Sequence, residues 1–279
     1  MIGLYALEEN IEMAAFADGL RAASLRYKYR NHNVFTPDQV EDFDIVVVTG
    51  LRDKGMVIKD CYQAIGVPVI VIDYGYMRRV SGVADFYTGH WQVGLNRLNW
   101  VPAFSCPADR FDALGVPIRN RTKRGNTILV CGQYSGDPSH GMTDQQMIDW
   151  AENQIKTAKQ NHPDAQVLWR PHPKMDRAFD VHGHDGISAG EINWDGVHSL
   201  VCINSNIGHE ALLNGVPVSC RDDAPYASLI DAQTQTQYDR RVEYFNRLAY
   251  AQWTLEEMRS GKAIEFILTA IRNDQCQKL

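Results

Sequence analysis

The stretch CINSNIGHEALLNGVPV (202–218) contains the end of one strand, a short helix and the start of another strand. The apolar run that precedes it breaks at residues 204–206, and the residues after Ile207 have helical spacing. Gly215 can adopt the left-handed conformation that ends a helix, and Pro217 can begin a strand without needing a backbone donor. Strand, helix and strand in this order predict a βαβ unit and a parallel sheet.

The same ending occurs once in each half of the chain, as AIGVPVIVID (64–73) and as LNGVPVSCRD (213–222). This arrangement predicts two similar α/β domains and not a short-period repeat. The basic, glycine-bearing segment 114–126 is the expected link, so we place the domains at residues 1–120 and 121–279.

Apolar runs and helical stripes occur in both predicted domains. Continuous apolar runs are typical of strands that are covered on both faces, whereas spacing of three and four residues predicts helices. The expected strands are 1–7, 44–50, 67–73, 126–132, 165–170 and 199–204, and the expected helices are 11–25, 55–65, 143–161 and 253–273. Thr143 is expected to cap the third helix, and Thr254 with Glu257 fits a capping box for the last.

The composition is that of a folded protein with a sizeable core. Of the 279 residues, 44% are hydrophobic and 22% are charged. No apolar run reaches the roughly 20 residues that span a bilayer, and the N-terminus lacks the basic start of a signal peptide. The six cysteines are dispersed without a CxxC pair, which fits buried thiols in a reducing compartment, so we expect a cytoplasmic protein. The net charge is −6 with the acidic excess in the second half, which leaves the first half better suited to an anionic partner.

Common catalytic and metal-binding motifs are absent. The sequence has no GxxxxGK[ST], GxGxxG, HExxH or GxSxG. HGHD (182–185) offers two histidines and an aspartate, but no distant third ligand is implied. We interpret it as a polar loop and expect no metal site.

Cationic residues follow the predicted strand 165–170. Arg170, His172 and Lys174 come at or directly after its end, and Pro173 is one of two prolines that stiffen the turn. Ligands of open α/β sheets bind at the carboxyl ends of the strands, and cationic donors there suit a phosphate or a carboxylate. A surface turn with incidental charges is the alternative.

The turn in 202–218 is also suited to an anion. Ser205, Asn206 and Gly208 surround the start of a helix, where unpaired N–H groups and the helix dipole favour negative charge. Ordinary capping by serine or asparagine is the alternative. The turn after 165–170 and this turn follow successive predicted strands, so we expect them side by side at one sheet edge, where they would suit a diphosphate or phosphodiester.

Together these segments resemble a known family. RPHP (170–173) and SNIGHEALLNGVPV (205–218) are similar to paired motifs of GT-B glycosyltransferases, in particular capsule-polysaccharide and Kdo-transferase-like enzymes and HP-motif sialyltransferase-like enzymes. The resemblance covers these segments of the second half alone. It implies two Rossmann-like domains facing a cleft, a donor site in the second domain, and a C-terminal helix that crosses back to the first.

The resemblance assigns roles to single residues. It implies that His172 and Ser205 hold the donor phosphate and that Gly132 and Gln133 border the donor cleft. Glu210 lies one turn into the helix and would contact the ribose or the nucleotide, although stabilisation by the helix dipole also explains a carboxylate there. The nucleotide-sugar is then a substrate, and no cofactor is expected.

The sequence departs from the family pattern at two positions. Asn206 stands where sialyltransferase-like enzymes often have serine or threonine, and Cys202 stands where the retaining E-x7-E pattern needs an acid. The cysteine at 202 disfavours the retaining class, so we expect an inverting transfer. We also expect it to be metal-independent, because a donor held by histidine and backbone amides would not require a metal ion. Such a transfer needs a carboxylate or histidine that takes the proton of the acceptor hydroxyl. The candidates at strand ends of the first domain are Asp73, then His90, then Glu8, with helix capping or a buried hydrogen bond as alternative roles.

Basic and aromatic residues alternate in RYKYRNHN (26–33). Arg26, Lys28 and Arg30 with the neighbouring tyrosines could grip nucleic acid by phosphate contact and stacking, although an ordinary solvated surface is the alternative. One hypothesis is therefore transfer to a hydroxymethylated base of phage DNA, in the host cytoplasm.

Trp91 lies in GHWQVGLNRLNW (89–100), which we interpret as part of an acceptor-binding loop. A glycan or capsule-type acceptor is the alternative to DNA. A sugar-nucleotide 2-epimerase on the same fold and a nucleotide-binding module without turnover are the alternatives to transfer. The oligomeric state is not predicted.

Overall fold

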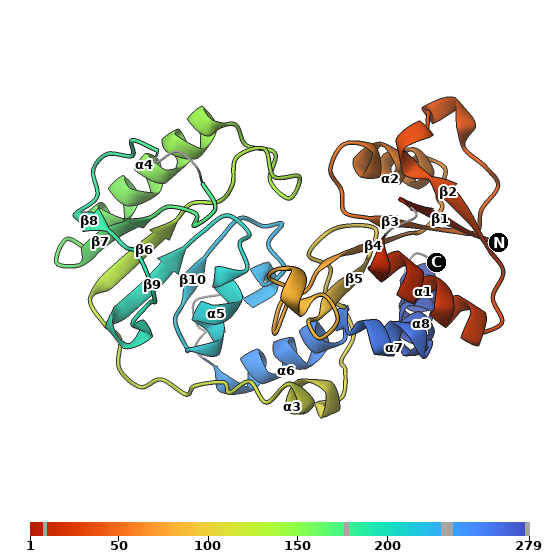
Figure 1. Cartoon of the computed structure of the whole chain (residues 1–279). Helices are drawn as coiled ribbons and strands as arrows, with labels where there is room; N and C mark the ends of the chain where they lie inside the picture. Colours follow the sequence, from red (N-terminus) through yellow and green to blue (C-terminus); the bar gives the residue numbers. More distant parts are fainter. Residues whose placement is uncertain (8–9, 176–178, 230–236, 277–279) are drawn as a thin grey trace. The chain divides into compact units, whose positions relative to one another are not determined.

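The structure is a computed structural model that describes residues 1–7, 10–175, 179–229 and 237–276. It divides into two compact α/β units (Figure 1). The first unit combines Met1–Gly115 with Phe245–Leu279, and the second is Val116–Tyr244. The boundary near residue 120 agrees with the expected division to within a few residues. The C-terminal residues differ, because residues from 245 onward belong to the first unit and not to the second.

The first unit is built on a six-stranded sheet. Its strands are β1 Ile2–Ala6, β2 Tyr27–Asn31, β3 Ile45–Thr49, β4 Val69–Tyr74, β5 Trp91–Leu95 and β11 Gln252–Trp253. They lie in the order β11-β5-β4-β3-β1-β2. The strands from β2 to β4 are parallel to one another, whereas β5 is antiparallel to β4 and β11 is antiparallel to β5.

Among the residues that the structure describes, five α-helices lie wholly within this unit. The α-helices are α1 Ile11–Ala22, α2 Lys54–Ala64, α3 Asp109–Leu114, α7 Leu255–Arg259 and α8 Lys262–Cys276. The 3₁₀ turns are η1 His32–Val34, η2 Pro37–Gln39 and η3 Val83–Asp85. Alternate strand residues face opposite sides, so Leu4 packs with α1, α7 and α8 while Tyr5 packs with α2. Both faces of the sheet are therefore covered, which explains why its strands read as continuous apolar runs.

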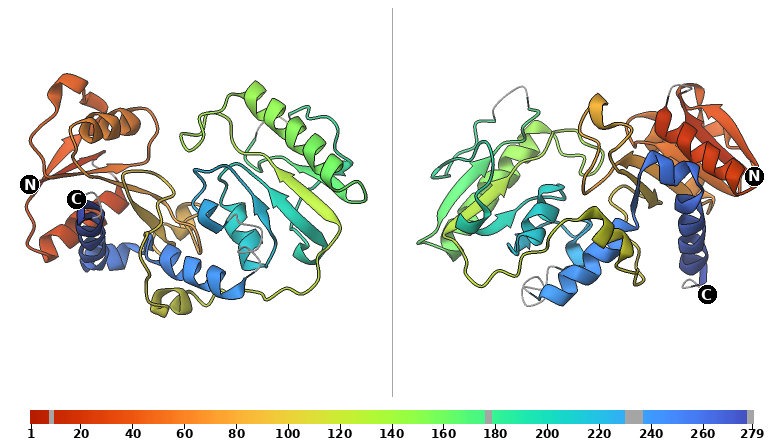
Figure 2. Two further views of the ribbon diagram at one scale, coloured as in Figure 1. Left: turned by 180° about the vertical axis from the view of Figure 1, so that it is seen from behind. Right: turned by 60° about the horizontal axis from the view of Figure 1, so that its bottom comes forward.

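The C-terminal segment belongs to this unit because its apolar side chains complete the same core. Leu255, Met258, Ile264 and Ile267 are buried with Phe16 of α1. The predicted return of a C-terminal helix to the first domain is confirmed (Figure 2). The single helix expected over 253–273 is divided into α7 and α8.

The second unit has a five-stranded parallel sheet in the order β10-β9-β6-β7-β8. Its elements are β6 Thr127–Cys131, α4 Asp144–Asn161, β7 Gln166–Arg170, β8 Gly186–Ile187, η4 Trp194–Gly196, β9 Val197–Val201, α5 Ile207–Leu213, β10 Val218–Ser219 and η5 Ala227–Leu229. The helix α6 Tyr238–Ala249 spans the boundary between the two units. The helix α4 covers one face of the sheet (Figure 2). Its buried side chains pack against Val130, Val167 and Trp169.

The expected helix ends are confirmed by backbone geometry. Gly66 and Gly215 have φ values of 80° and 69°, the left-handed conformation that follows α2 and α5. Thr143 and Thr254 each form the capping box that starts α4 and α7.

Two segments that were not predicted as strands form strands. Residues 27–31, which we interpreted as a basic surface segment, form the edge strand β2, and residues 91–95, which we placed in an acceptor loop, form β5. Every helix among the described residues is too short or too polar to cross a bilayer.

Candidate functional site

The carboxyl edge of the second sheet contains a topological switch point. From β6 the chain passes to β7 on one side, and it later returns to β9 on the other side of β6. The connections therefore diverge between β6 and β9, where open parallel sheets bind ligands. Residues 132–134, 171–174 and 202–206 follow β6, β7 and β9 at this edge.

Both predicted anion-binding turns are at this edge, but they are not immediate neighbours. The turn 171–174 follows β7 and the turn 204–206 follows β9, and β6 lies between these strands. The expectation that the two turns lie side by side is therefore wrong in detail. The order of the strands along the chain does not reveal that β9 pairs on the far side of β6.

The turn after β7 orients the imidazole of His172. His172 Nδ1 accepts a hydrogen bond from the backbone N–H of Lys174 at 3.2 Å. The neutral ring therefore carries its proton on Nε2, which is a donor. Tyr134, which follows β6, packs edge-on against this ring with centroids 6.3 Å apart. Pro173 lies between His172 and the exposed Lys174, so the turn carries an imidazole and an ammonium group two residues apart in the chain.

Arg170 has a different environment from the one we expected. Its guanidinium donates to Ser188 Oγ at 3.3 Å and to the carbonyl of Gly190 at 2.7 Å. These bonds tie the end of β7 to the loop after β8. Arg170 therefore has a structural role in this state.

Gln133 and Asn204 join the two strands of the switch point. Gln133 Nε2 donates to Asn204 Oδ1, and the Asn204 backbone N–H donates to Gln133 Oε1, both at 2.8 Å. Ser139 adds a bond from its Oγ to Asn204 Oδ1 at 3.2 Å, and its carbonyl accepts from Asn204 Nδ2 at 2.7 Å. Arg221, which follows β10, also donates to the Ser139 carbonyl. Buried amides that satisfy one another in this way hold the edge in one shape.

The turn before α5 is only weakly capped. Ser205 Oγ lies 3.5 Å from the Ile207 backbone nitrogen, and Asn206 makes no side-chain capping bond. Asn206 Oδ1 instead lies 2.9 Å from Nδ1 of the buried His209, whose Nε2 is 2.9 Å from the Tyr244 hydroxyl. Ordinary capping by Asn206 is therefore wrong, and its side chain is oriented by His209.

The glycines at this edge are explained by aromatic packing. A Cβ at Gly132 would lie 2.4 Å from Trp169, and one at Gly208 would lie 2.2 Å from Tyr226. No larger residue fits at either position without a shift of the ring. The hydroxyl of Tyr226 also donates to the Ser205 carbonyl at 2.8 Å, so the same ring holds the turn in place.

Glu210 is an exposed residue in the first turn of α5. This position agrees with both interpretations, a dipole-stabilised carboxylate and an acceptor for ribose hydroxyls.

Two acidic residues lie near the carboxyl edge of the first sheet. Asp73 is the penultimate residue of β4, and its Oδ1 accepts from the backbone N–H of Tyr74 at 2.6 Å. Glu12 in the first turn of α1 is close enough that burial, and in smaller part the charge of Asp73, raise the pKa of the Glu12 carboxyl. Asn10 Nδ2 donates to Glu12 Oε1 at 3.0 Å and to Thr49 Oγ1 at 2.9 Å. Glu12 was not among the residues predicted from the sequence.

The other two candidate proton acceptors are less well supported. His90 is half-buried against the Arg78 backbone, with its Nδ1 at 3.4 Å from that carbonyl, and burial lowers the pKa of its ring. Glu8 lies outside the described residues.

The acceptor candidates of the first unit do not form a cationic surface together. Lys28 Nζ and the guanidinium of Arg30 both bind the carboxylate of Glu41. Arg26 is exposed, whereas Trp91 is 5% exposed and packs in the core from β5. The alternating basic residues belong to an edge strand, where Lys28 and Arg30 form ion pairs with Glu41. This arrangement accounts for the basic pattern without a nucleic-acid partner.

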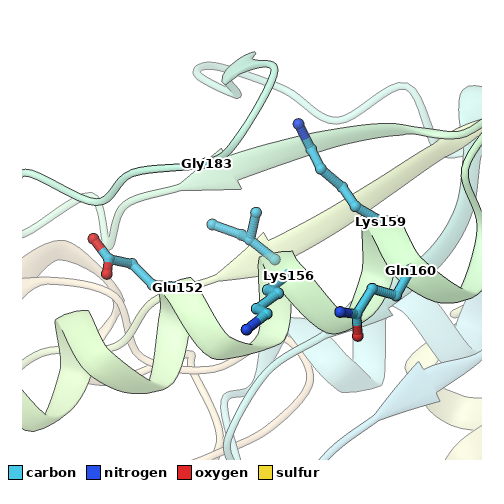
Figure 3. Close-up of a pocket in the computed structure, with 6 residues that line it drawn as sticks. Glu152, Lys156, Lys159, Gln160 and Gly183 are labelled. Atoms are coloured by element: carbon cyan, nitrogen blue, oxygen red, sulfur yellow. The ribbon is translucent and has the colours of Figure 1, made fainter.

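A separate pocket of about 370 Å³ lies over the middle of α4 (Figure 3). Glu152, Lys156, Lys159 and Gln160 line it together with Gly183 of the HGHD segment. Lys159 pairs with Asp185 there. Among the described residues, no group of three or more His, Cys, Asp or Glu side chains could hold a metal ion.

Comparison with known proteins identifies the architecture. No family model and no curated protein sequence matches the chain. Two solved structures from Thermosulfurimonas dismutans do: the KpsC β-Kdo 2,4 transferase has a TM-score of 0.60 at 16% identity and 91% coverage of both chains. The chain has the fold of this transferase. The KpsC β-Kdo 2,7 transferase has a TM-score of 0.51 at 14% identity, over 94% of this chain and 98% of that one. The expected GT-B-like fold is confirmed.

Within this GT-B-like fold, several site residues were not found by motif. Tyr134, Ser139 and Asn204 follow strand ends, so their position after apolar runs was the available signal. Tyr226 and Arg221 gave no local signal, because they reach the edge from later in the chain. Glu12 could have been found only by asking which helix starts near the end of β4.

Proposed function

We propose that the chain is a glycosyltransferase that moves a sugar from a nucleotide-sugar donor to an acceptor hydroxyl. The observation that carries the proposal is the switch point of the second sheet. There, the turn that carries His172 follows β7 on one side of β6, and the polar turn 204–206 follows β9 on the other side. The fold that the chain shares with two sugar transferases supports this assignment.

The donor phosphate is assigned to the carboxyl edge of the second sheet. His172 Nε2–H and the ammonium of Lys174 would stabilise the negative charge that develops on the leaving phosphate. Ser205 and Asn206 would supply neutral donors from the other turn, and Glu210 would accept from the ribose. Charge stabilisation by these groups leaves no step that requires a metal ion.

Proton removal is assigned to Asp73 of the first unit. A carboxylate that accepts the hydroxyl proton as the sugar is transferred leads to a single displacement and to inversion at the anomeric carbon. The negative charge of Asp73 contributes, in smaller part than burial, to the raised pKa of the Glu12 carboxyl. NMR analysis of the anomeric configuration of the product tests this step. A retained configuration would exclude direct displacement and favour a covalent intermediate on a carboxylate.

A carbohydrate acceptor is favoured over DNA. The pairing of Lys28 and Arg30 with Glu41 offsets part of the positive charge on which the DNA hypothesis relied. Mass spectrometry of nucleosides from hydroxymethylated DNA, after incubation with the protein and mixed donors, tests that hypothesis directly. Because both structural neighbours are named for Kdo transfer, a Kdo donor is the first to assay.

The experiment that tests the function is a thermal-shift measurement with UMP, UDP, CMP, GDP and dTDP. A nucleotide that binds the native state must raise the melting temperature. Replacing His172 by alanine should abolish the shift. His182→Ala is the matched control, because the His182 side chain is 72% exposed and lies outside the two turns. A chain that responds to no nucleotide would contradict the proposal, and an unchanged response in His172→Ala would contradict the phosphate assignment.

The remaining alternatives differ in turnover. A 2-epimerase would convert a UDP-sugar without any acceptor, and a binding module would bind a nucleotide without consuming a donor. Product analysis with and without acceptor separates these outcomes from transfer.

A further inference from the structure

A pocket of about 360 Å³ lies at the carboxyl ends of β1 and β2 in the first unit. Tyr5 and Asn31 come from those strand ends, and the η1–η2 segment that follows β2 forms the other wall. Its principal lining residues are Tyr5, Arg30, Asn31, Phe35, Gln39 and Glu41. The volume is at the lower end of the range of about 300–1,000 Å³ that small-molecule sites occupy.

The hydroxyl group of Tyr5, which lines this pocket, can donate a hydrogen bond to a ligand. The Tyr62 hydroxyl oxygen accepts from the Glu41 backbone N–H at 3.0 Å and lies 2.7 Å from the Tyr5 hydroxyl oxygen. Whichever hydroxyl donates to the other, one hydroxyl hydrogen has no acceptor within the described parts of the chain. Tyr62 does not line the pocket, so its hydrogen would be stranded in the core, at a cost of about 1–3 kcal/mol. The favoured arrangement has Tyr62 donating to Tyr5, which leaves the Tyr5 hydrogen for an oxygen in the pocket.

The charges in the pocket wall neutralise one another. Arg30 binds Glu41 through two guanidinium nitrogens, and Lys28 Nζ lies 3.1 Å from the same carboxylate. A ligand that carries a negative charge would have to compete with Glu41 for these cations. The wall therefore suits an uncharged ligand with hydroxyl groups, which can bind the guanidinium, the carboxylate and the carboxamides of Asn31 and Gln39 at once.

The pocket also has an aromatic floor. The rings of Tyr5 and Phe35 meet edge to face with centroids 5.4 Å apart, and both residues are buried. Aromatic rings beside planar polar groups match a sugar, which has an apolar ring face and a rim of hydroxyls. From these features we propose that the pocket binds an uncharged sugar unit. Given the proposed function, this unit would belong to a glycan acceptor.

Saturation-transfer NMR on the full chain, with free sugars and no nucleotide, tests the site. The probes are glucose, galactose and N-acetylglucosamine, with glucuronate and galacturonate as charged counterparts. We expect signals from at least one neutral sugar and a loss of most of that signal in Val34→Trp, which fills the pocket from an exposed position. Ile65→Trp is the matched control, because Ile65 is 60% exposed and does not line the pocket.

A charge change at Glu41 gives a second test. Glu41→Gln keeps the shape of the wall but leaves Arg30 and Lys28 without their carboxylate, so binding should shift toward the uronates by several-fold. The proposal is overturned if no neutral sugar binds, if Val34→Trp binds sugars as the wild type does, or if Glu41→Gln leaves the preference unchanged. 5-Hydroxymethyldeoxycytidine is added as a non-sugar-selective probe, and signals from it without signals from any neutral sugar would also overturn the proposal. Nucleotide thermal shifts on the same samples report on the donor site, so failure of one assignment is distinguishable from failure of the other.

Discussion

At the scale of single residues, the site depends on contacts between distant parts of the chain. The sequence predicted that polar residues follow the strands at 170 and 204, because a break in an apolar run is visible locally. The sequence could not predict that Tyr226 packs too close to Gly208 for a side chain there, or that Asn206 forms a hydrogen bond with His209. Both contacts depend on the folded structure. The same reason hid Glu12, which meets Asp73 only after the sheet has formed.

The ionised carboxylate of Glu12 is expected to lower the free energy of unfolding at neutral pH. Its carboxyl pKa is raised above the ordinary 4.5 by burial, and in smaller part by Asp73, so the folded state binds its proton more tightly than the unfolded state. Stability then falls as the pH rises above 4.5, through the folded pKa. Glu12→Gln keeps the bond from Asn10 and removes the charge, so we expect a gain of about 1 kcal/mol in unfolding free energy at pH 7.

Urea denaturation at pH 7 and at pH 4 measures this effect. The gain should shrink at pH 4, where the wild-type carboxyl is protonated in both states. Glu265→Gln is the control, since Glu265 is exposed and should change stability by less than about 0.5 kcal/mol. A loss of equal size at both pH values would contradict the assignment of a buried, destabilising charge.

At the scale of elements, strands and helices were predicted correctly where apolar residues recur at a regular spacing. The buried strands and the helices α1, α2 and α4 carry apolar residues at clear spacing. The strand β2 was missed because its residues alternate basic and aromatic at a sheet edge, which reads equally well as a binding segment. The strand β5 was missed because Gln92 and Gly94 interrupt its apolar run, although Gln92 is buried.

The short helix α3 is expected to hold the C-terminal segment in place through one side chain. Arg110 donates to the carbonyls of Ala249 and Gln252 and to Glu257, and its guanidinium lies 3.7 Å from the Trp253 ring centroid. Lysine can neither form this fork nor stack in the same way. We expect Arg110→Lys to reduce the unfolding free energy by about 2 kcal/mol.

Chemical denaturation of Arg110→Lys tests this prediction. Burial pushes the pKa of Glu257 upward, but the bonds from Arg110 and Thr254 outweigh it and hold the pKa below the ordinary 4.5. This contribution is complete above 4.5 and is lost as the pH falls through the folded pKa, so the difference from wild type should narrow in acid. Arg259→Lys, at an exposed ion pair with Asp18, is the control and should be close to neutral. Equal effects of the two substitutions would refute the special role of Arg110.

At the scale of the whole molecule, two α/β units with a repeated helix ending were predictable from the sequence. The assignment of residues 245–279 was not evident from the strand pattern, because an amphipathic helix does not show which sheet it covers. The GT-B resemblance supplied the expectation that the structure confirms.

Deletion of residues 254–279 should damage the first unit selectively. It removes Met258, Ile264 and Ile267 from the core around α1, while the second unit keeps its sheet and α4. Limited proteolysis with mass spectrometry should then show cleavage within residues 1–115 and protection of 127–229. Deletion of 274–279 alone is the control and should leave both units protected. Uniform cleavage of both units after the longer deletion would show that the units do not fold separately.

The discontinuous first unit also has a consequence for synthesis on the ribosome. Its first 115 residues emerge early, but the last helices of its core follow only after the whole second unit has been made. At translation rates of about 5–20 residues per second, that interval is on the order of ten seconds. During this time the face of α1 that α7 and α8 later cover remains accessible to chaperones, whereas the second unit can already close. The unit that begins the chain is therefore expected to be the last to finish folding, and slowing translation after residue 244 should increase chaperone capture of the nascent chain.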